Sequence, residues 1–162
     1  MAPTVSAGID TPGFAFNFHV LSKSGKFDSL PSIFSQILSG EKPGRIVYSD
    51  DQAFALLTTA PIQPGHTLII PKQEIDHWID MPPGLSAHLF LVAQKVAHAI
   101  QTSFNPEKVG LIIAGLEVRH THIHLIPIHT LQDLEFSRQN KDVLPEELDK
   151  AAQILKNALK SF

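Results

Sequence analysis

Apolar residues recur along this chain with two different spacings, one typical of helices and the other typical of strands. Between residues 83 and 103 they return every three or four positions, which predicts a helix that packs one side against a sheet. The positions concerned are Leu85, Leu89, Val92, Val96 and Ile100. The same spacing predicts a short helix over residues 32–38, and Pro145 followed by two glutamates begins a final helix that runs to about residue 160.

Short segments rich in β-branched and aromatic residues separate these helices and predict strands. They cover residues 45–49, 53–58, 66–70, 109–114 and 120–128. The first three follow one another through turns, as in an antiparallel meander. Strands grouped in this way, with helices inserted at intervals, favour an α+β fold with an antiparallel sheet over a parallel sheet with alternating helices.

The amino-terminal residues differ in character from the rest of the chain. Residues 1–28 contain several glycines and prolines and show little periodicity, which predicts an extended arm. Within the arm, Phe14, Phe16 and Phe18 alternate, a spacing that would give a short strand one apolar face. We therefore expect one compact domain over residues 29–162 that includes the carboxyl-terminal helix, a size sufficient for one buried core.

Composition and charge narrow the function classes. The formal net charge is −3 and the basic residues are scattered, so nothing indicates a surface for nucleic acid, while small phosphorylated ligands need only a local site. No apolar run approaches the ~20 residues that span a bilayer, and no secretory signal is evident. The chain has no cysteine, which excludes disulfides and cysteine-based zinc sites. We expect a cytoplasmic protein that binds neither membranes nor nucleic acid.

Three alternating histidines carry the clearest chemical signal. If residues 120–128 form a strand, His120, His122 and His124 share one face of it, while the intervening side chains face the core. Such a row of imidazoles titrates near neutral pH, can donate hydrogen bonds to an anion and can supply a nucleophile. Two other interpretations stay open. One is a chance pattern in a chain with nine histidines, and the other is a metal site, since neighbouring histidines of a strand can share one ion.

A fourth histidine follows a turn. In residues 64–72, Pro64 and Gly65 deliver His66 to the start of an apolar strand that Pro71 closes. Taken by itself, His66 is typical of a partly buried residue at a strand end. Only its combination with other segments of the chain gives it a further meaning.

Three segments of the chain resemble the histidine-triad (HIT) family. The family signature, three histidines that alternate with apolar residues, resembles residues 120–127, which read His-Thr-His-Ile-His-Leu-Ile-Pro. Residues 33–43 resemble the family's opening helix and loop, and residues 64–72 resemble its strand with a Pro-Gly-His start. The resemblance implies a HIT-like α+β fold with about five antiparallel strands. It also implies a homodimer in which the helix after Pro83 and the adjacent edge strands of two subunits meet.

The resemblance implies hydrolysis or transfer at the α-phosphate of a purine nucleotide, with a phosphoramidate or phosphoanhydride bond as the one that breaks. His122 corresponds to the family nucleophile, which forms a covalent nucleotidyl-histidine that water or another acceptor resolves. His124 and His66 correspond to the histidines that contact phosphate, and His120 corresponds to the residue that orients the nucleophile. This pathway needs no metal or other cofactor.

Four further positions bear on the substrate. Ile33 and Phe34 correspond to the apolar wall against which the family stacks a purine. Thr58 stands where the nucleoside phosphoramidase branch has an aspartate that holds the ribose hydroxyls, and Glu117 stands in the segment where that branch contacts the phosphate and the leaving group. Because these departures could weaken catalysis, two alternatives to a hydrolase remain: a nucleotide-binding or interaction protein, and a histidine-rich metalloprotein.

Overall fold

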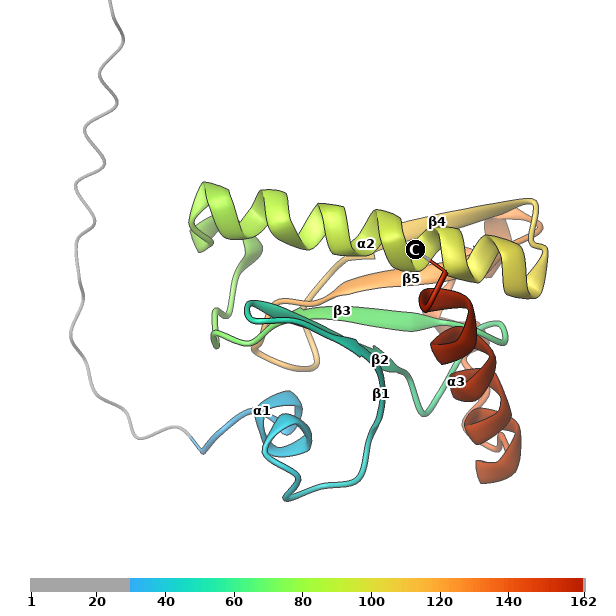
Figure 1. The fold of residues 1–162 in the computed structure, drawn as a ribbon, viewed down its shortest axis with the longest axis horizontal. Helices are drawn as coiled ribbons and strands as arrows, with labels where there is room; N and C mark the ends of the chain where they lie inside the picture. Colours follow the sequence, from blue (N-terminus) through green and yellow to red (C-terminus); the bar gives the residue numbers. More distant parts are fainter. Residues whose placement is uncertain (1–29, 162) are drawn as a thin grey trace, which may run out of the picture.

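The computed structural model of this protein describes residues 30–161, so the arm predicted over residues 1–28 lies outside the described residues. The helices and strands are α1 (Ile33–Leu38), β1 (Arg45–Ser49), β2 (Ala53–Leu57), β3 (Thr67–Pro71), α2 (Pro83–Phe104), β4 (Lys108–Ile113), β5 (Ile123–Ile128) and α3 (Pro145–Leu159). Short 3-10 helices lie in the loops at η1 (Trp78–Asp80), η2 (Leu131–Leu134) and η3 (Phe136–Arg138). Every helix and strand predicted from the apolar pattern is present (Figure 1).

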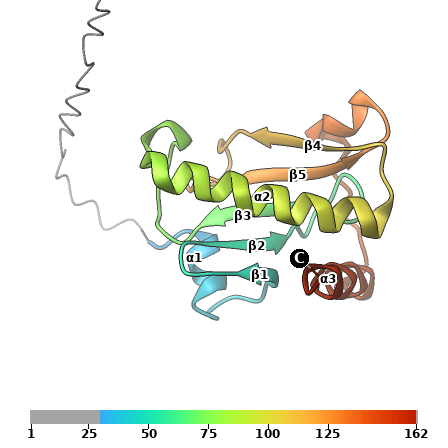
Figure 2. The same ribbon diagram turned by 45° about the horizontal axis from the view of Figure 1, so that its top comes forward.

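The five strands form one antiparallel sheet in the order β1-β2-β3-β5-β4. Because β5 pairs with both β3 and β4, it lies inside the sheet, and β1 and β4 form the two edges (Figure 2). The α+β class and the antiparallel sheet predicted from the sequence are therefore confirmed.

Helices cover both faces of the sheet, with α2 and α3 on one face and α1 on the other (Figures 1 and 2). The larger apolar cluster lies under α2 and α3 and includes Leu57 and Ile69, whereas the smaller cluster joins Phe34 of α1 to Leu68 of β3. Directly paired residues of an antiparallel ladder point to the same face, and Leu68 pairs with His124. His124 therefore lies on the face that α1 covers.

The strand predicted over residues 120–128 is shorter than expected, because β5 begins only at Ile123. The cause is local hydrogen bonding. The N–H of Thr121 donates to the carbonyl oxygen of Ile75 at 2.7 Å, and the N–H of His120 donates to a carbonyl oxygen two residues earlier in the chain. These bonds take the backbone out of the ladder, so the first two of the three alternating histidines precede the strand.

The other predicted limits agree with the structure to within one residue. At α1 the difference has a clear cause, since the Ser32 hydroxyl accepts the N–H of Ser35 and caps the helix from outside. At the end of α2, Asn105 adopts a left-handed conformation with φ 48° and stops the helix before Pro106. None of the helices between residues 30 and 161 has the length and apolar content that crossing a membrane takes.

Candidate functional site

Four histidines lie together on the α1 face of the sheet. His66 directly precedes β3, His124 belongs to β5, and His120 and His122 come from the segment before β5. His66 and His120 are fully buried, His122 is 6% exposed and His124 is 8% exposed. The ring centroids of His122 and His124 are 4.8 Å apart, and those of His66 and His124 are 5.3 Å apart. The structure thus brings together the four histidines that the sequence singled out.

The turn before β3 holds His66 in one orientation. Gly65 has φ +92°, a conformation that favours glycine, and the N–H of Ile62 in the same turn donates to Nδ1 of His66 at 3.3 Å. A neutral ring that accepts at Nδ1 carries its proton on Nε2. Nε2 of His66 therefore donates to Nδ1 of His124, 3.0 Å away, and His124 keeps its own N–H at Nε2. The hydrogen-bond partners thus assign the tautomers of both rings.

His120 is held at both ring nitrogens. Its Nε2 donates to the carbonyl oxygen of Pro71, at the end of β3, over 2.8 Å. Since that oxygen can only accept, Nδ1 of His120 is the acceptor nitrogen, and it receives the hydroxyl of Ser32 at 2.6 Å. The ring is fixed between the start of α1 and the end of β3.

The two ring nitrogens of His122 differ: Nδ1 donates a hydrogen bond, and Nε2 carries a lone pair. Its Nδ1 donates to the backbone carbonyl oxygen of His120 at 2.7 Å, so the proton of the neutral ring sits on Nδ1 and Nε2 is unprotonated. The ring of Phe34 packs edge-on against both histidines, with centroids 5.0 Å from His122 and 5.7 Å from His120. An unprotonated imidazole nitrogen held in this way is a competent nucleophile.

Burial keeps the four rings neutral. It lowers the pKa of His66 to about 4. Burial, together with the neighbouring His122 and His66 rings, lowers the pKa of His124 to about 3. Burial also lowers the pKa of His120 and of His122. At neutral pH the cluster therefore combines the lone pair of His122 with the N–H donor of His124.

A cavity of about 620 Å³ lies at the start of α1, and none of the four clustered histidines lines it directly. Its lining includes Ser32, whose hydroxyl contacts His120, and Ile33, which is 36% exposed. Glu117 also lines it, and the negative charge of its carboxylate opposes the lowering of the His122 pKa by burial. Ile33 and Glu117 therefore lie at one opening, and the Glu117 charge acts on the nucleophile candidate.

Phe34 and Thr58, the other two residues expected near the substrate, have different surroundings. Phe34 is 5% exposed and lies behind the histidine rings. Thr58 follows β2, and its N–H donates to the carbonyl oxygen of His66 at 3.2 Å. The Thr58 hydroxyl accepts the N–H of Ala60 at 3.4 Å within its own turn. Thr58 thus lies beside the backbone of one histidine of the cluster.

Three residues that the sequence did not single out also belong to this site. Phe136 of η3 packs edge-on against His124 with centroids 4.8 Å apart, Ser32 contacts the cluster through its hydroxyl, and Glu74 accepts the N–H of Ser32 at 2.9 Å. Ser32 had a detectable signal, because a serine directly before an apolar helix is a typical N-cap. Glu74 and Phe136 come from loops, where no periodicity places a side chain.

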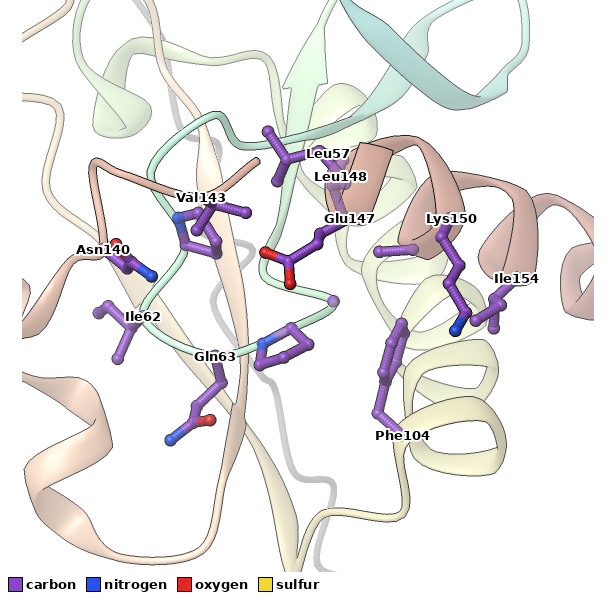
Figure 3. A pocket seen from close by; sticks show the side chains of 14 residues that line it. Leu57, Ile62, Gln63, Phe104, Asn140, Val143, Glu147, Leu148, Lys150 and Ile154 are labelled. Carbon is purple, nitrogen blue, oxygen red and sulfur yellow. The ribbon is translucent and has the colours of Figure 1, made fainter. Parts of the chain in front are cut away.

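A second cavity, of about 380 Å³, lies behind the turn that carries His66 (Figure 3). Side chains from that turn, from the end of α2 and from the start of α3 line it, and Phe104 and Glu147 border it from the two helices. Gln63 in the turn donates to Asp133 at 3.0 Å and so ties the turn to η2. None of the four clustered histidines lines this cavity.

Within residues 30–161, no group of three or more histidine, cysteine, aspartate or glutamate side chains has the arrangement of a metal site. The ring nitrogens explain this in part. Both nitrogens of His66 and His120 already have partners, as do Nδ1 of His122 and Nδ1 of His124. A structural zinc ion usually takes four protein ligands, so this geometry gives the metal interpretation no support.

The chain is similar to a known protein family and to individual proteins of known name. A family model described as HIT domain matches residues 39–131, more than half of the chain. An uncharacterized HIT-like protein from Borreliella burgdorferi is 34% identical over 116 residues, which cover 67% of this chain and 84% of that protein. Among solved structures, a zinc-bound histidine triad family protein from Mycobacterium smegmatis matches with a TM-score of 0.69 and 27% identity, over 80% of this chain and 93% of that one.

Two further relatives have names that describe an activity. An adenylylsulfatase from Arabidopsis thaliana is 33% identical over 100 residues, which cover 59% of this chain and 51% of that protein. A bis(5'-adenosyl)-triphosphatase from Dictyostelium discoideum is 29% identical over 114 residues, which cover 67% of this chain and 73% of that protein. Both names refer to compounds of adenosine.

Proposed function

Because this chain belongs to the HIT domain family, we propose that it is a hydrolase or transferase that acts at the α-phosphate of a purine nucleotide phosphoramidate or phosphoanhydride. The observation that carries the proposal is the state of His122. Its ring is buried, its pKa is lowered by burial, and Nδ1 is committed to the carbonyl oxygen of His120. Nε2 is therefore the nitrogen available for attack on phosphorus.

The reaction runs as two displacements at one phosphorus atom. Nε2 of His122 attacks the α-phosphorus, and a P–N bond forms while the bond to the leaving group breaks and the leaving group takes its electron pair, an amine also taking a proton from solvent. The carbonyl oxygen of His120 stabilises the positive charge that develops on the ring, because it accepts the Nδ1 proton. Water then attacks the phosphorus, the P–N bond breaks, and a proton passes to solvent as the neutral ring returns.

His124 and His66 support the charge that develops on the phosphate oxygens. The bond from Nε2 of His66 to Nδ1 of His124 leaves the N–H of His124 at Nε2, where it can donate to a phosphate oxygen. This donor is in place before substrate binds, so no reorganisation is needed during the reaction.

An adenine nucleotide is the substrate we favour. Two relatives have names that refer to adenylyl or adenosyl compounds, and Ile33 gives the cavity at the start of α1 an apolar wall for a purine ring. Phe34 supports that wall from behind, next to His122, and the Thr58 hydroxyl is the candidate partner of the ribose. The leaving group is an amine, a sulfate or a second nucleotide.

Turnover measured on a substrate panel tests the proposal. The panel contains adenosine and guanosine phosphoramidates, dinucleoside polyphosphates and adenosine phosphosulfate. We expect the wild type to hydrolyse at least one adenosine compound and His122→Ala to lose that activity while it stays folded, because the change removes the attacking nitrogen. His98→Ala, at an exposed histidine of α2, is the matched control and should keep the activity. Equal turnover by the wild type and His122→Ala would overturn the mechanism.

A second candidate function is nucleotide binding with weak or no catalysis. The observation that favours it is the Glu117 carboxylate, which lines the cavity at the start of α1 and acts electrostatically on His122, because its negative charge would repel a phosphate and its leaving group. Calorimetry separates the two functions. Measurable affinity for adenosine compounds without turnover on the whole panel would favour the binding protein.

We propose further that the domain extends over residues 29–162 behind an arm over residues 1–28, and that it acts as a cytoplasmic homodimer. Support for the dimer comes from exposed apolar side chains on α2 and on the edge strand β4. Phe90 is 46% exposed, Leu91 is 65% exposed and Leu111 is 43% exposed. A second copy of the chain would cover them.

A further inference from the structure

A chain of hydrogen bonds runs from the loop after β3 to the nucleophile candidate. Oε1 of Glu74 accepts the backbone N–H of Ser32 at 2.9 Å. The hydroxyl of Ser32 donates to Nδ1 of His120 at 2.6 Å, and the carbonyl oxygen of His120 accepts the Nδ1 proton of His122 at 2.7 Å. Residues from three separate parts of the sequence thus form one connected path that ends on the ring of His122.

One arrangement of donors and acceptors gives every group of this path a partner. His120 gives its only ring proton to Pro71, so it needs a donor at Nδ1, and the single hydroxyl proton of Ser32 supplies it. A lone pair of the same hydroxyl accepts the N–H of Ser35 at 3.2 Å. Glu74 stays ionised, because a hydrogen bond from the Ser35 side chain and another from the Ser32 backbone hold its pKa below the usual range.

We propose that Glu74 and Ser32 are positioning residues of the nucleophile: they hold the ring of His120 in place, so that the carbonyl oxygen of His120 fixes the ring of His122 through its Nδ1 proton and leaves Nε2 free to attack. The chemistry of this inference rests on the proposed function. Neither residue touches the reacting atoms. Phe34 packs against the rings of both His120 and His122, so a shift of the His120 ring is passed on to the His122 ring.

Two other roles for these residues predict different results. Ser32 caps α1, so its loss weakens the helix whatever happens to the histidines. Gln36→Gly is the matched control for this effect, because it weakens the same helix while the Gln36 side chain donates to the carbonyl oxygen of Pro31 and not to the histidines among the described residues. Ser32 and Glu74 also line the cavity, so a direct contact with substrate would raise KM instead of lowering kcat.

The test is steady-state kinetics of the full-length protein with adenosine 5'-phosphoramidate. We expect Ser32→Ala and Glu74→Ala each to lower kcat about tenfold with KM changed less than about twofold, as for one lost hydrogen bond to a buried acceptor. The double variant should be no slower than Ser32→Ala, because both changes break the same path. Ser32→Thr, which keeps the hydroxyl, should restore kcat, and Gln36→Gly should leave it unchanged.

Proton NMR of the histidine rings gives a readout that does not depend on turnover. We expect a slowly exchanging Nδ1 proton on His122 in the wild type and in Gln36→Gly, and exchange about tenfold faster in Ser32→Ala and Glu74→Ala, as for one lost hydrogen bond. Unchanged exchange in those two variants would overturn the positioning role even if the protein hydrolyses no nucleotide. Unchanged kcat in Ser32→Ala, a rise in KM alone, or an equal loss of kcat in Gln36→Gly would also overturn it. Absence of turnover in the wild type, with the expected exchange rates, contradicts only the proposed function.

Discussion

His66 and His124 share one hydrogen bond, and the accepting ring of His124 must be neutral to form it. A second proton on His66 would meet the N–H of Ile62, which already donates to Nδ1. A second proton on His124 would meet the Nε2 proton of His66. Either event replaces an acceptor with a donor: protonation of His66 breaks its bond with Ile62, and protonation of His124 breaks the pair. The hydrogen bonds of both rings are therefore complete only while both rings are neutral.

The first prediction concerns the pH dependence of stability. The pKa of His66 is lowered to about 4 in the folded protein, while an unfolded histidine titrates near pH 6.5. Between these values the unfolded chain binds more protons than the folded one, so stability falls as pH falls through this range and is constant above about pH 7.5. By linkage, His66 costs the wild type about 2 kcal/mol of unfolding free energy between pH 7.5 and pH 5.

The matched variant is His66→Asn, whose amide oxygen stands in for Nδ1 as the acceptor of the Ile62 N–H and does not titrate. Urea unfolding at pH 7.5 and pH 5 should show a smaller acid loss of stability in the variant, by about 2 kcal/mol. His124, with its pKa lowered to about 3, should still destabilise both proteins in acid. An identical acid loss in the two proteins would show that His66 is not held neutral by the fold.

The second prediction concerns Gly65, which starts the turn into His66. Its φ of +92° disfavours any side chain, and an added Cβ would lie 2.6 Å from ring atoms of Phe104. We expect Gly65→Ala to lower the free energy of unfolding by about 2 to 4 kcal/mol, from the strained backbone and the overpacked ring together. Gly84→Ala, where a Cβ meets nothing within 4 Å, is the control and should leave urea stability nearly unchanged. Equal stability of the two variants would contradict the account of this turn.

At the scale of elements, the sequence was sufficient because the helices have one apolar side and the strands are short apolar segments bounded by turns. The spacing of Leu85, Leu89 and Val92 locates α2, and all three are buried in the structure. The alternation of the three histidines correctly predicts that they gather, although the strand itself starts only at Ile123. That limit depends on a hydrogen bond from Thr121 to a loop nearly fifty residues away, and no local spacing encodes such a contact.

Residues of the candidate site could be predicted where they stand in a regular sequence pattern, and not where they come from loops. His66 and the alternating histidines were found because each stands at a strand start or in a period-two pattern. Glu74 and Phe136 were not found, because long-range packing brings each loop residue to the histidines. The sequence also does not predict the direction of the Phe34 side chain. The apolar pattern of α1 does not show that Phe34 faces the histidines while Ile33 faces the cavity.

At the scale of the whole molecule, the site and the exposed apolar residues lie on different sides. The histidines occupy the face that α1 covers, whereas Phe90 and Leu91 project from α2, on the other face of the sheet. Leu111 adds to them from the edge strand β4, where it pairs with Leu125 of the α2 face. Association through this surface would leave the cavity at the start of α1 open.

The third prediction therefore concerns association. We expect sedimentation at micromolar concentration to give twice the mass of one chain for the wild type, and Leu91→Lys to shift the protein toward the monomer, because a buried charge opposes apolar contact. Leu116→Lys, at a 91% exposed residue outside α2 and β4, is the control and should not change the mass. A wild type that sediments as a monomer would contradict the proposed dimer and leave the catalytic proposal untouched.

The proposed mechanism requires that His122 forms a covalent bond to the nucleotide. The intact mass of protein quenched during turnover of adenosine 5'-phosphoramidate tests this step. We expect the wild type to gain the mass of one adenylyl group, peptide mapping to place it on His122, and His122→Ala to gain none. Turnover without any adduct in the wild type, or an adduct on a residue other than His122, would contradict it.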